Sequence, residues 1–147
     1  MNKIINKLKY WYYFLFKKQI TKEVTLMYLN KINLNGRMYT TEIVKPAIEV
    51  YNNKHSHYGE IGYTEYYNVT LENISHEVTN VYIDGNEVKG TIKTLNTSKG
   101  RELTSFINDV VFRPKSNGTV EDNIVVNLEI FSFNAVLKND DAFSNCF

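Results

Sequence analysis

The sequence is poor in cysteine and has almost no net charge, and both features exclude classes of function. Its single cysteine, Cys146, can form no internal disulfide and supplies no metal-binding cluster, so a reducing cytosol is the natural compartment. The formal net charge is +1, which gives no global basic field of the kind that drives nucleic-acid binding. We therefore expect neither a disulfide-stabilised secreted domain nor a nucleic-acid-binding protein.

Long apolar runs are also missing. The uninterrupted run Tyr10–Phe16 is far too short to cross a bilayer, and no small-residue cleavage site follows it as in a secretory signal. The sequence thus predicts no transmembrane segment and no secretion. With 147 residues and ordinary globular composition, it predicts one compact domain with a core of its own.

The first 20 residues stand apart from the rest. Met1–Lys18 carries apolar residues at helical spacing with lysines around them, which predicts a basic amphipathic helix. Such a helix could lie on a membrane surface or dock into a groove of a partner. It could equally pack against its own domain or against a second copy. We assign residues 1–20 to an N-terminal extension and residues 21–147 to the domain.

The first part of the domain predicts a strand, a turn and a helix. Glu23–Leu29 is rich in β-forming residues, and the turn residues of Asn33–Arg37 follow it. Thr40 or Thr41 can cap the helix, whose regular part should begin near Pro46 because proline is disfavoured inside a helix.

A hairpin and a second helix come next. Val78–Ile83 and Glu87–Leu95 alternate in polarity on either side of Asp84-Gly85-Asn86, which is typical of a β-hairpin. Either Thr97 or Ser98 can cap a short helix that should end near Asn108.

The C-terminal third predicts two more strands. Val110–Phe112 reads as a short strand, which Pro114 and the Ser116-Asn117-Gly118 cluster should end in a turn. In the long last strand, apolar residues change parity at Ile130–Phe131, which predicts a β-bulge or sharp bend there. About six or seven strands with two or three peripheral helices indicate an α+β domain, mainly an antiparallel barrel or sandwich.

The histidines are the candidate chemical residues. His55 and His57 lie two apart in a predicted loop, but no carboxylate or thiol pattern completes a metal site with them, so we expect solvated loop side chains and no cofactor. His76, in the pair Ser75-His76, could be a catalytic base if a nucleophile reaches it. The alternative is a half-buried strand histidine hydrogen-bonded to a neighbour.

A set of short motifs resembles the prohead core proteases of T-even-type tailed phages. The match begins with Asn33-Leu34-Asn35-Gly36-Arg37-Met38-Tyr39, for the family's N-x-N-G-R-x-Y, and covers roughly Glu23–Phe147. The later pieces follow in the family's order: Gly59-Glu60-Ile61, Ile74-Ser75-His76, Gly85-Asn86-Glu87-Val88-Lys89-Gly90, Leu95-Asn96-Thr97-Ser98-Lys99-Gly100 and Phe133-Asn134-Ala135-Val136.

The resemblance implies a fold like the herpesvirus capsid-maturation protease, a β-barrel surrounded by helices. It also implies a serine endopeptidase that acts inside the prohead on scaffold and capsid proteins. In that family the histidine of S-H is the general base, the nucleophile is the first serine of S-[SP]-R-x-x-G, and the aspartate of F-D-x-V is the third member.

Carried over residue by residue, the resemblance is incomplete at the catalytic positions. His76 matches the base, but Arg113 occupies the nucleophile position when Gly118 is aligned with the motif glycine. An ungapped alignment instead places Ser116 at the nucleophile and loses the arginine and glycine that follow. Asn134 stands where the family has its aspartate.

These replacements change the chemistry. Arginine stays protonated and cannot be a nucleophile. Asparagine cannot supply the charge that stabilises an imidazolium, and a comparable Asp→Asn change in a serine-protease triad costs about 10⁴ in rate.

Two hypotheses follow. In the first, the protein is a non-catalytic, prohead-protease-like structural protein of phage capsid assembly that binds capsid, scaffold or other virion proteins. The N-terminal helix would be its docking element, and it could form a homo-oligomer. In the second, it is an active prohead maturation endopeptidase that uses His76 and Ser116, with Asp109 or His57 as a third member and backbone amides of a Lys115–Gly118 turn as oxyanion donors. Either would work in the host cytoplasm during assembly, in the prohead or in the virion.

Overall fold

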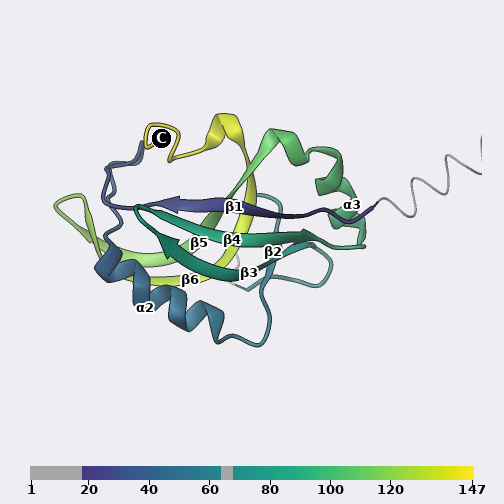
Figure 1. Cartoon of the computed structure of the whole chain (residues 1–147), viewed down its shortest axis with the longest axis horizontal. Helices are drawn as coiled ribbons and strands as arrows, with labels where there is room; N and C mark the ends of the chain where they lie inside the picture. The colour runs from purple at the N-terminus through teal and green to yellow at the C-terminus, as the bar shows by residue number, and fades with distance from the viewer. Residues whose placement is uncertain (1–17, 64–67) are drawn as a thin grey trace, which may run out of the picture.

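The computed structural model describes residues 18–63 and 68–147, which fold around two antiparallel sheets (Figure 1). The first sheet has the order β1-β4-β3-β2, and each neighbouring pair is antiparallel. Its strands are β1 (Thr21–Tyr28), β2 (Tyr58–Glu60), β3 (Ile74–Asp84) and β4 (Glu87–Thr94). The second sheet is a single long hairpin of β5 (Val110–Glu121) and β6 (Ile124–Leu137).

The predicted antiparallel α+β architecture is therefore present, but the predicted barrel is wrong. One isolated parallel bridge, between Ile61 and Ala135, links the β2 end of the first sheet to β6. At the other end β1 pairs only with β4 and β5 only with β6. In the described part of the chain no backbone hydrogen bond joins β1 to β5, so the two sheets do not close.

Two α-helices and two 3₁₀ turns lie around the sheets of the described chain. They are α2 (Thr41–Asn52), α3 (Ser98–Ser105), η1 (Ile107–Asp109) and η2 (Lys138–Asp140). Helix α2 runs along β3 and β6 and buries Val44, Ala47, Ile48 and Tyr51 against them (Figure 1).

Helix α2 begins earlier than the sequence predicted, since its regular part was expected to start near Pro46. The helix is continuous from Thr41, and Pro46 lies inside it without a break. Proline removes the hydrogen bond to the carbonyl of Glu42. Both Pro46 and Glu42 are exposed, so solvent can satisfy that carbonyl.

Helix α3 has Thr97 as its N-cap, one of the two residues, Thr97 and Ser98, that the sequence offered. The side chain of Thr97 accepts a hydrogen bond from the backbone N–H of Gly100 at 3.0 Å, and its hydroxyl donates to the carbonyl of Ile74 on β3 at 2.8 Å. The cap therefore also fixes the helix to the first sheet. The helix ends at Ser105, a little earlier than expected, and η1 continues the chain.

The hairpin of β3 and β4 was correctly predicted, with Gly85 at φ +60° in its turn. The predicted turn at Pro114 and Ser116–Gly118 is wrong, because these residues lie inside β5. Pro114 is tolerated because β5 is an edge strand and the position of its missing N–H faces away from β6. The hairpin turns later, at Asp122 and Asn123, which both have positive φ as in a type I′ turn.

The predicted bulge in the last strand is confirmed. Lys115 pairs with Ser132 while the next residue, Ser116, pairs with Ile130, so Phe131 is the extra residue on β6. The bulge lets Ile130 and Phe133 both reach the core, where they are 2% and 0% exposed.

The predicted N-terminal helix, Met1–Lys18, lies outside the described residues except for Lys18. Among the helices that are described, none has the length and apolar character needed to span a membrane.

Candidate functional site

His76 lies in the core, where β3 faces the second sheet. Its side chain is 0% exposed. The ring Nε2 is 2.7 Å from the backbone oxygen of Phe133 on β6, and Nδ1 is 2.7 Å from the hydroxyl of Ser75. The ring of Phe112, from β5, packs edge-on against the imidazole with the centroids 4.8 Å apart.

These partners fix the tautomer of the ring. A carbonyl oxygen only accepts, so Nε2 must carry the proton that is donated to Phe133. Nδ1 is then the acceptor, and the Ser75 hydroxyl, whose oxygen also lies 3.3 Å from the carbonyl of Gly59, donates to Nδ1 at the shorter distance. Burial lowers the pKa of His76 to about 4, although the hydrogen bond to Phe133 acts in the opposite direction.

Gly59 on β2 makes this arrangement possible. A Cβ at this position would come within 2.3 Å of both Nε2 of His76 and the carbonyl oxygen of Phe133. The absence of a side chain therefore lets β2 pack directly over the hydrogen bond between the two sheets and seal it from solvent.

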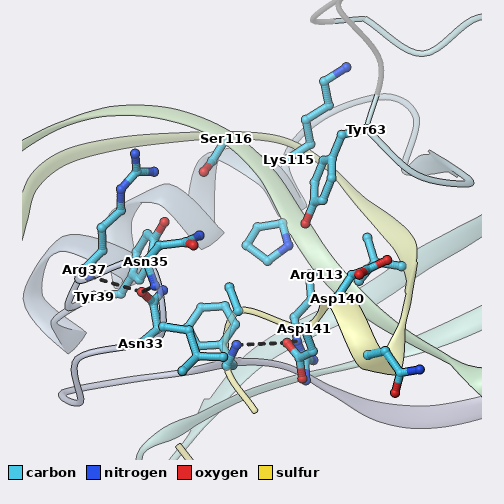
Figure 2. A pocket seen from close by; sticks show the side chains of 16 residues that line it. Asn33, Asn35, Arg37, Tyr39, Tyr63, Arg113, Lys115, Ser116, Asp140 and Asp141 are labelled. Carbon is cyan, nitrogen blue, oxygen red and sulfur yellow. Dashed lines mark hydrogen bonds and ion pairs between the residues drawn. The ribbon is translucent and has the colours of Figure 1, made fainter. Parts of the chain in front are cut away.

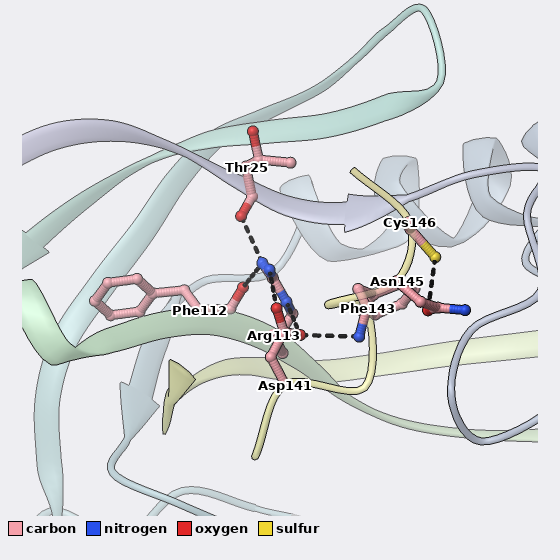
Figure 3. Close-up of polar contacts among 7 residues, drawn as sticks. All are labelled: Thr25, Phe112, Arg113, Asp141, Phe143, Asn145 and Cys146. Atoms are coloured by element: carbon pink, nitrogen blue, oxygen red, sulfur yellow. Dashed lines mark hydrogen bonds and ion pairs between the residues drawn. The ribbon is translucent and has the colours of Figure 1, made fainter. Parts of the chain in front are cut away.

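Arg113 lies on the opposite face of β5 from Phe112, as strand alternation requires. Figure 3 shows its guanidinium clamped by Asp141, with Nε 2.8 Å from Oδ1 and Nη2 2.8 Å from Oδ2. Nη1 donates to the backbone oxygens of Thr25 on β1, at 2.7 Å, and of Phe112, at 3.0 Å. Arg113 is 5% exposed, so this is a buried, bidentate ion pair with further backbone partners.

The electrostatics of Asp141 follow from this pairing. Burial alone would raise the pKa of its carboxyl group, but the hydrogen bonds from Arg113 and from the backbone N–H of Phe143 outweigh burial, and the net shift is downward. The carboxylate thus stays charged and holds the arginine. No sequence motif indicated Asp141, because its partner is 28 residues away.

Asn134, on the same face of the hairpin as its register partner Arg113, is fully buried and uses both ends of its amide. Its Oδ1 accepts from the backbone N–H of Glu60 at 3.2 Å and from the hydroxyl of Ser132 at 2.8 Å. Its Nδ2 donates to the carbonyl of Gly62 at 2.7 Å. A carboxylate could not make this last bond, because it has no hydrogen to donate.

Ser116 lies elsewhere in the protein. It is half-buried on β5 and lines a cavity of about 420 Å³ (Figure 2). Arg113, Lys115 and Tyr63 also line this cavity, and His76 does not. In the described part of the chain no hydrogen bond joins Ser116 to His76, whose ring nitrogens already have partners.

In the described part of the chain, neither of the other expected participants is hydrogen-bonded to His76. The ring Nε2 of His57 lies 3.1 Å from the carbonyl oxygen of Tyr51, and Asp109 is exposed in η1. Residues 115–118 form part of β5, so the expected oxyanion turn is a strand instead. Among the described residues no cluster of three or more metal-binding side chains occurs.

Glu60 is a residue that the sequence did not single out as chemical. It is 1% exposed, and neither oxygen of its carboxyl group has a hydrogen-bond partner among the described residues. It neighbours Gly59 and Ile61, and its own N–H bonds Asn134, so it belongs to the polar layer between β2 and β6.

Comparison with known proteins gives a match at the level of structure. No family model and no curated protein matches the sequence. The solved structure of the bacteriophage T4 capsid assembly protease, gp21, is similar with a TM-score of 0.66 and 21% sequence identity, over 80% of this chain and 81% of that one. The chain has the fold of a phage prohead protease. The likeness confirms the resemblance to the prohead-protease fold, without the closed barrel that was expected, and at this identity it extends to the fold alone.

The Arg113–Asp141 pair gives a first prediction. Arg113→Met should lower the free energy of unfolding by about 3–5 kcal/mol, because it leaves the buried carboxylate of Asp141 unpaired. Urea denaturation at pH 7 measures the loss. Because the pKa of Asp141 is lowered in the folded state, the stabilisation is present above its unfolded value and is lost as the pH falls through the lower, folded value.

A matched control is Lys89→Met, which removes the exposed ion pair with Asp84 and should change stability far less. Arg113→Met combined with Asp141→Leu should recover part of the loss, since no charge then stays buried. Equal effects of Arg113→Met and Lys89→Met would contradict the role that we assign to the buried pair.

His76 gives a second prediction, on pH. Its pKa is about 4 in the folded state and 6.5 in the unfolded chain, so the unfolded chain binds more protons between these values. Stability should be constant above about pH 6.5 and fall by about 3 kcal/mol as the pH drops towards 4. Denaturation from pH 7.5 to 4.5 measures the fall, and His55→Gln, at an exposed loop position, should leave it unchanged. A flat profile in the wild type would contradict a buried, neutral His76.

Proposed function

We propose that this protein is a capsid-assembly protein of a tailed phage that has a prohead-protease fold and no peptidase activity. The observation that carries the proposal is the state of His76. A general base of a serine protease needs one nitrogen with a free lone pair towards the nucleophile and an N–H towards an acid. In His76 the lone pair of Nδ1 is taken by Ser75, and the N–H of Nε2 points to a carbonyl.

Access supports the same conclusion. A peptide substrate must come within hydrogen-bond reach of the base or the nucleophile. His76 has no exposed surface, and Phe112 and the β2 backbone at Gly59 lie against its ring. Substrate could reach this ring only if β2 separated from β6.

The residues at the family's other two catalytic positions have structural roles. Arg113 joins β5 to β1 through Thr25 and to the C-terminal segment through Asp141, and Asn134 fixes β2 to β6. Serine in place of Arg113 would lie on the face of β5 away from His76, so this single change would not rebuild a dyad.

The assembly role rests on the structural likeness to a protein whose own role is capsid assembly. A protein of this kind would bind capsid, scaffold or other virion proteins in the host cytoplasm, in the prohead or in the virion, and it could form a homo-oligomer. We further propose that Met1–Lys18 forms the docking helix. Its basic and apolar residues suit a partner groove, and they precede the domain that matches the protease fold.

A second candidate, an active serine endopeptidase, is favoured by one observation. Ser116 is half-buried beside a cavity large enough for a side chain of a substrate, and Arg113–Ser116 line that cavity together. Activity would then require a rearrangement that frees His76 from Phe133 and brings it to this serine.

A fluorophosphonate probe tests activity. We expect the full-length protein to show no labelling under conditions in which a commercial serine protease is labelled completely, because in the described part of the chain no hydrogen bond joins Ser116 to the candidate base, His76. Intact-mass spectrometry after incubation measures the adduct, and Ser116→Ala is the matched control. Labelling that is lost in both Ser116→Ala and His76→Ala would show that the protein is a protease.

Deletion of Met1–Lys18 tests the docking helix. The shortened protein should keep the thermal unfolding midpoint of the full chain but fail to enter particles assembled in infected cells, measured by immunoblot of purified virions. A variant with the apolar residues of Tyr10–Phe16 replaced by serine should behave alike. Normal incorporation of either protein would mean that the segment is not the docking element.

A further inference from the structure

The open seam between β1 and β5 is the feature that the proposed function does not use. Strand alternation shows which backbone groups of β1 point into it. The N–H of Thr94 bonds the carbonyl of Ile20 at 2.9 Å, so Ile20, Lys22 and Val24 direct their backbone groups towards β4. Glu23 and Thr25 must direct theirs to the opposite side, towards the seam.

The contacts of Arg113 agree with this assignment. Its Nη1 donates to Thr25 O on β1 and to Phe112 O on β5, so both carbonyls face the seam. Arg113 thus takes the place of one backbone hydrogen bond between the two edges. On the N-terminal side of this bridge along β1, the N–H and C=O of Glu23 and the N–H of Thr25 have no backbone partner among the described residues.

A groove of about 450 Å³ lies beside this free edge. Its walls are largely apolar, and they come from β1, from the start of β5 and from the C-terminal residues. The lining includes Val24, Tyr28, Val110, Val111, Phe112 and Phe147. Unpaired strand edges with apolar surface beside them are the places where extended segments of other chains add as strands.

The charged side chains that line the groove indicate which kind of segment could bind in it. Lys22 and Lys138 both line the groove, are exposed, and form no ion pair with a described residue. The acidic group of the lining, Asp141, is already neutralised by Arg113. The groove therefore presents net positive charge to an occupant.

The chain's own N-terminal segment does not match this charge. Met1–Lys18 has lysines at positions 3, 7, 9, 17 and 18 and no acidic residue. An acidic segment of a different protein complements Lys22 and Lys138, whereas this basic one is repelled by them.

We propose that the outer edge of β1 and the groove beside it bind an extended acidic segment of another protein, which adds to the first sheet as a further strand. The backbone groups of Glu23 and Thr25 supply hydrogen bonds, the groove receives alternate apolar side chains, and Lys22 and Lys138 bind carboxylates. This deepens the proposed function, since it states the chemistry of a partner segment, and it leaves the absence of peptidase activity as a separate question.

Glu23→Pro is the decisive variant. Proline at this position removes only the N–H that faces the seam and leaves the pairing with β4 in place. Glu23→Ala is the matched control, because both changes remove the carboxylate while only proline removes the N–H. Circular dichroism and the thermal midpoint of each variant confirm that it is folded.

The probe is a fluorescein-labelled heptapeptide library with glutamate at both ends and valine, isoleucine or threonine between them. A matched library has lysine at both ends. By fluorescence anisotropy, the acidic library should bind wild type at least about tenfold more tightly than the basic one, and Glu23→Pro should weaken it about tenfold while Glu23→Ala does not. Lys22→Glu combined with Lys138→Glu should reverse the preference between the libraries.

Hydrogen exchange in the wild-type protein gives a readout that needs no variant. The amides of Glu23 and Thr25 should exchange more slowly when the acidic library is bound. The proposal is overturned if the protection appears elsewhere, if neither library binds below about 1 mM, or if Glu23→Pro binds as well as Glu23→Ala. It is also overturned if a peptide of Met1–Lys18 binds the groove better than the acidic library. None of these outcomes bears on fluorophosphonate labelling, so failure here is distinct from failure of the proposed function.

Discussion

The buried ion pair between Arg113 and Asp141 is the interaction on which the rest of the structure depends. One guanidinium joins three parts of the chain that are far apart in sequence: β1 through Thr25, β5 through Phe112, and the C-terminal turn through Asp141. A buried ion pair of this kind is not by itself strongly stabilising, because both charges lose their water. Its effect is to specify the arrangement, since either charge left alone in that position would cost several kcal/mol.

The polar residues on the two faces of the β5–β6 hairpin serve packing. On one face His76 joins β3 to β6, and on the other Asn134 joins β2 to β6. Each of these side chains has its polar atoms paired, as burial requires. A catalytic site needs the opposite, a group that is held in position and still has an unsatisfied function to offer a substrate. The fold of a phage capsid assembly protease is thus compatible with a protein that assembles and does not cleave.

Local features were predictable where the chain itself carries the signal. The β3–β4 hairpin, the Thr97 cap and the bulge at Phe131 follow from turn residues, capping chemistry and a change of parity, all within a few residues. The turn predicted at Pro114 was wrong because proline is excluded from a strand only where its N–H is needed. Whether the N–H is needed depends on which side of β5 pairs with β6, and no local sequence signal near Pro114 indicates that side.

The sequence by itself determined the chemical limits of the candidate site. Aligned on the motif glycine, it places a guanidinium and an amide at two catalytic positions of the prohead-protease motifs that it resembles, and neither can act as nucleophile or acid whatever surrounds it. Only the tertiary structure decided the state of His76. The same imidazole is a base or a structural donor according to where its proton lies, and that is set by Phe133, a residue 57 positions away. The open seam beside β1 is likewise tertiary, because an edge is free only when no other strand has reached it.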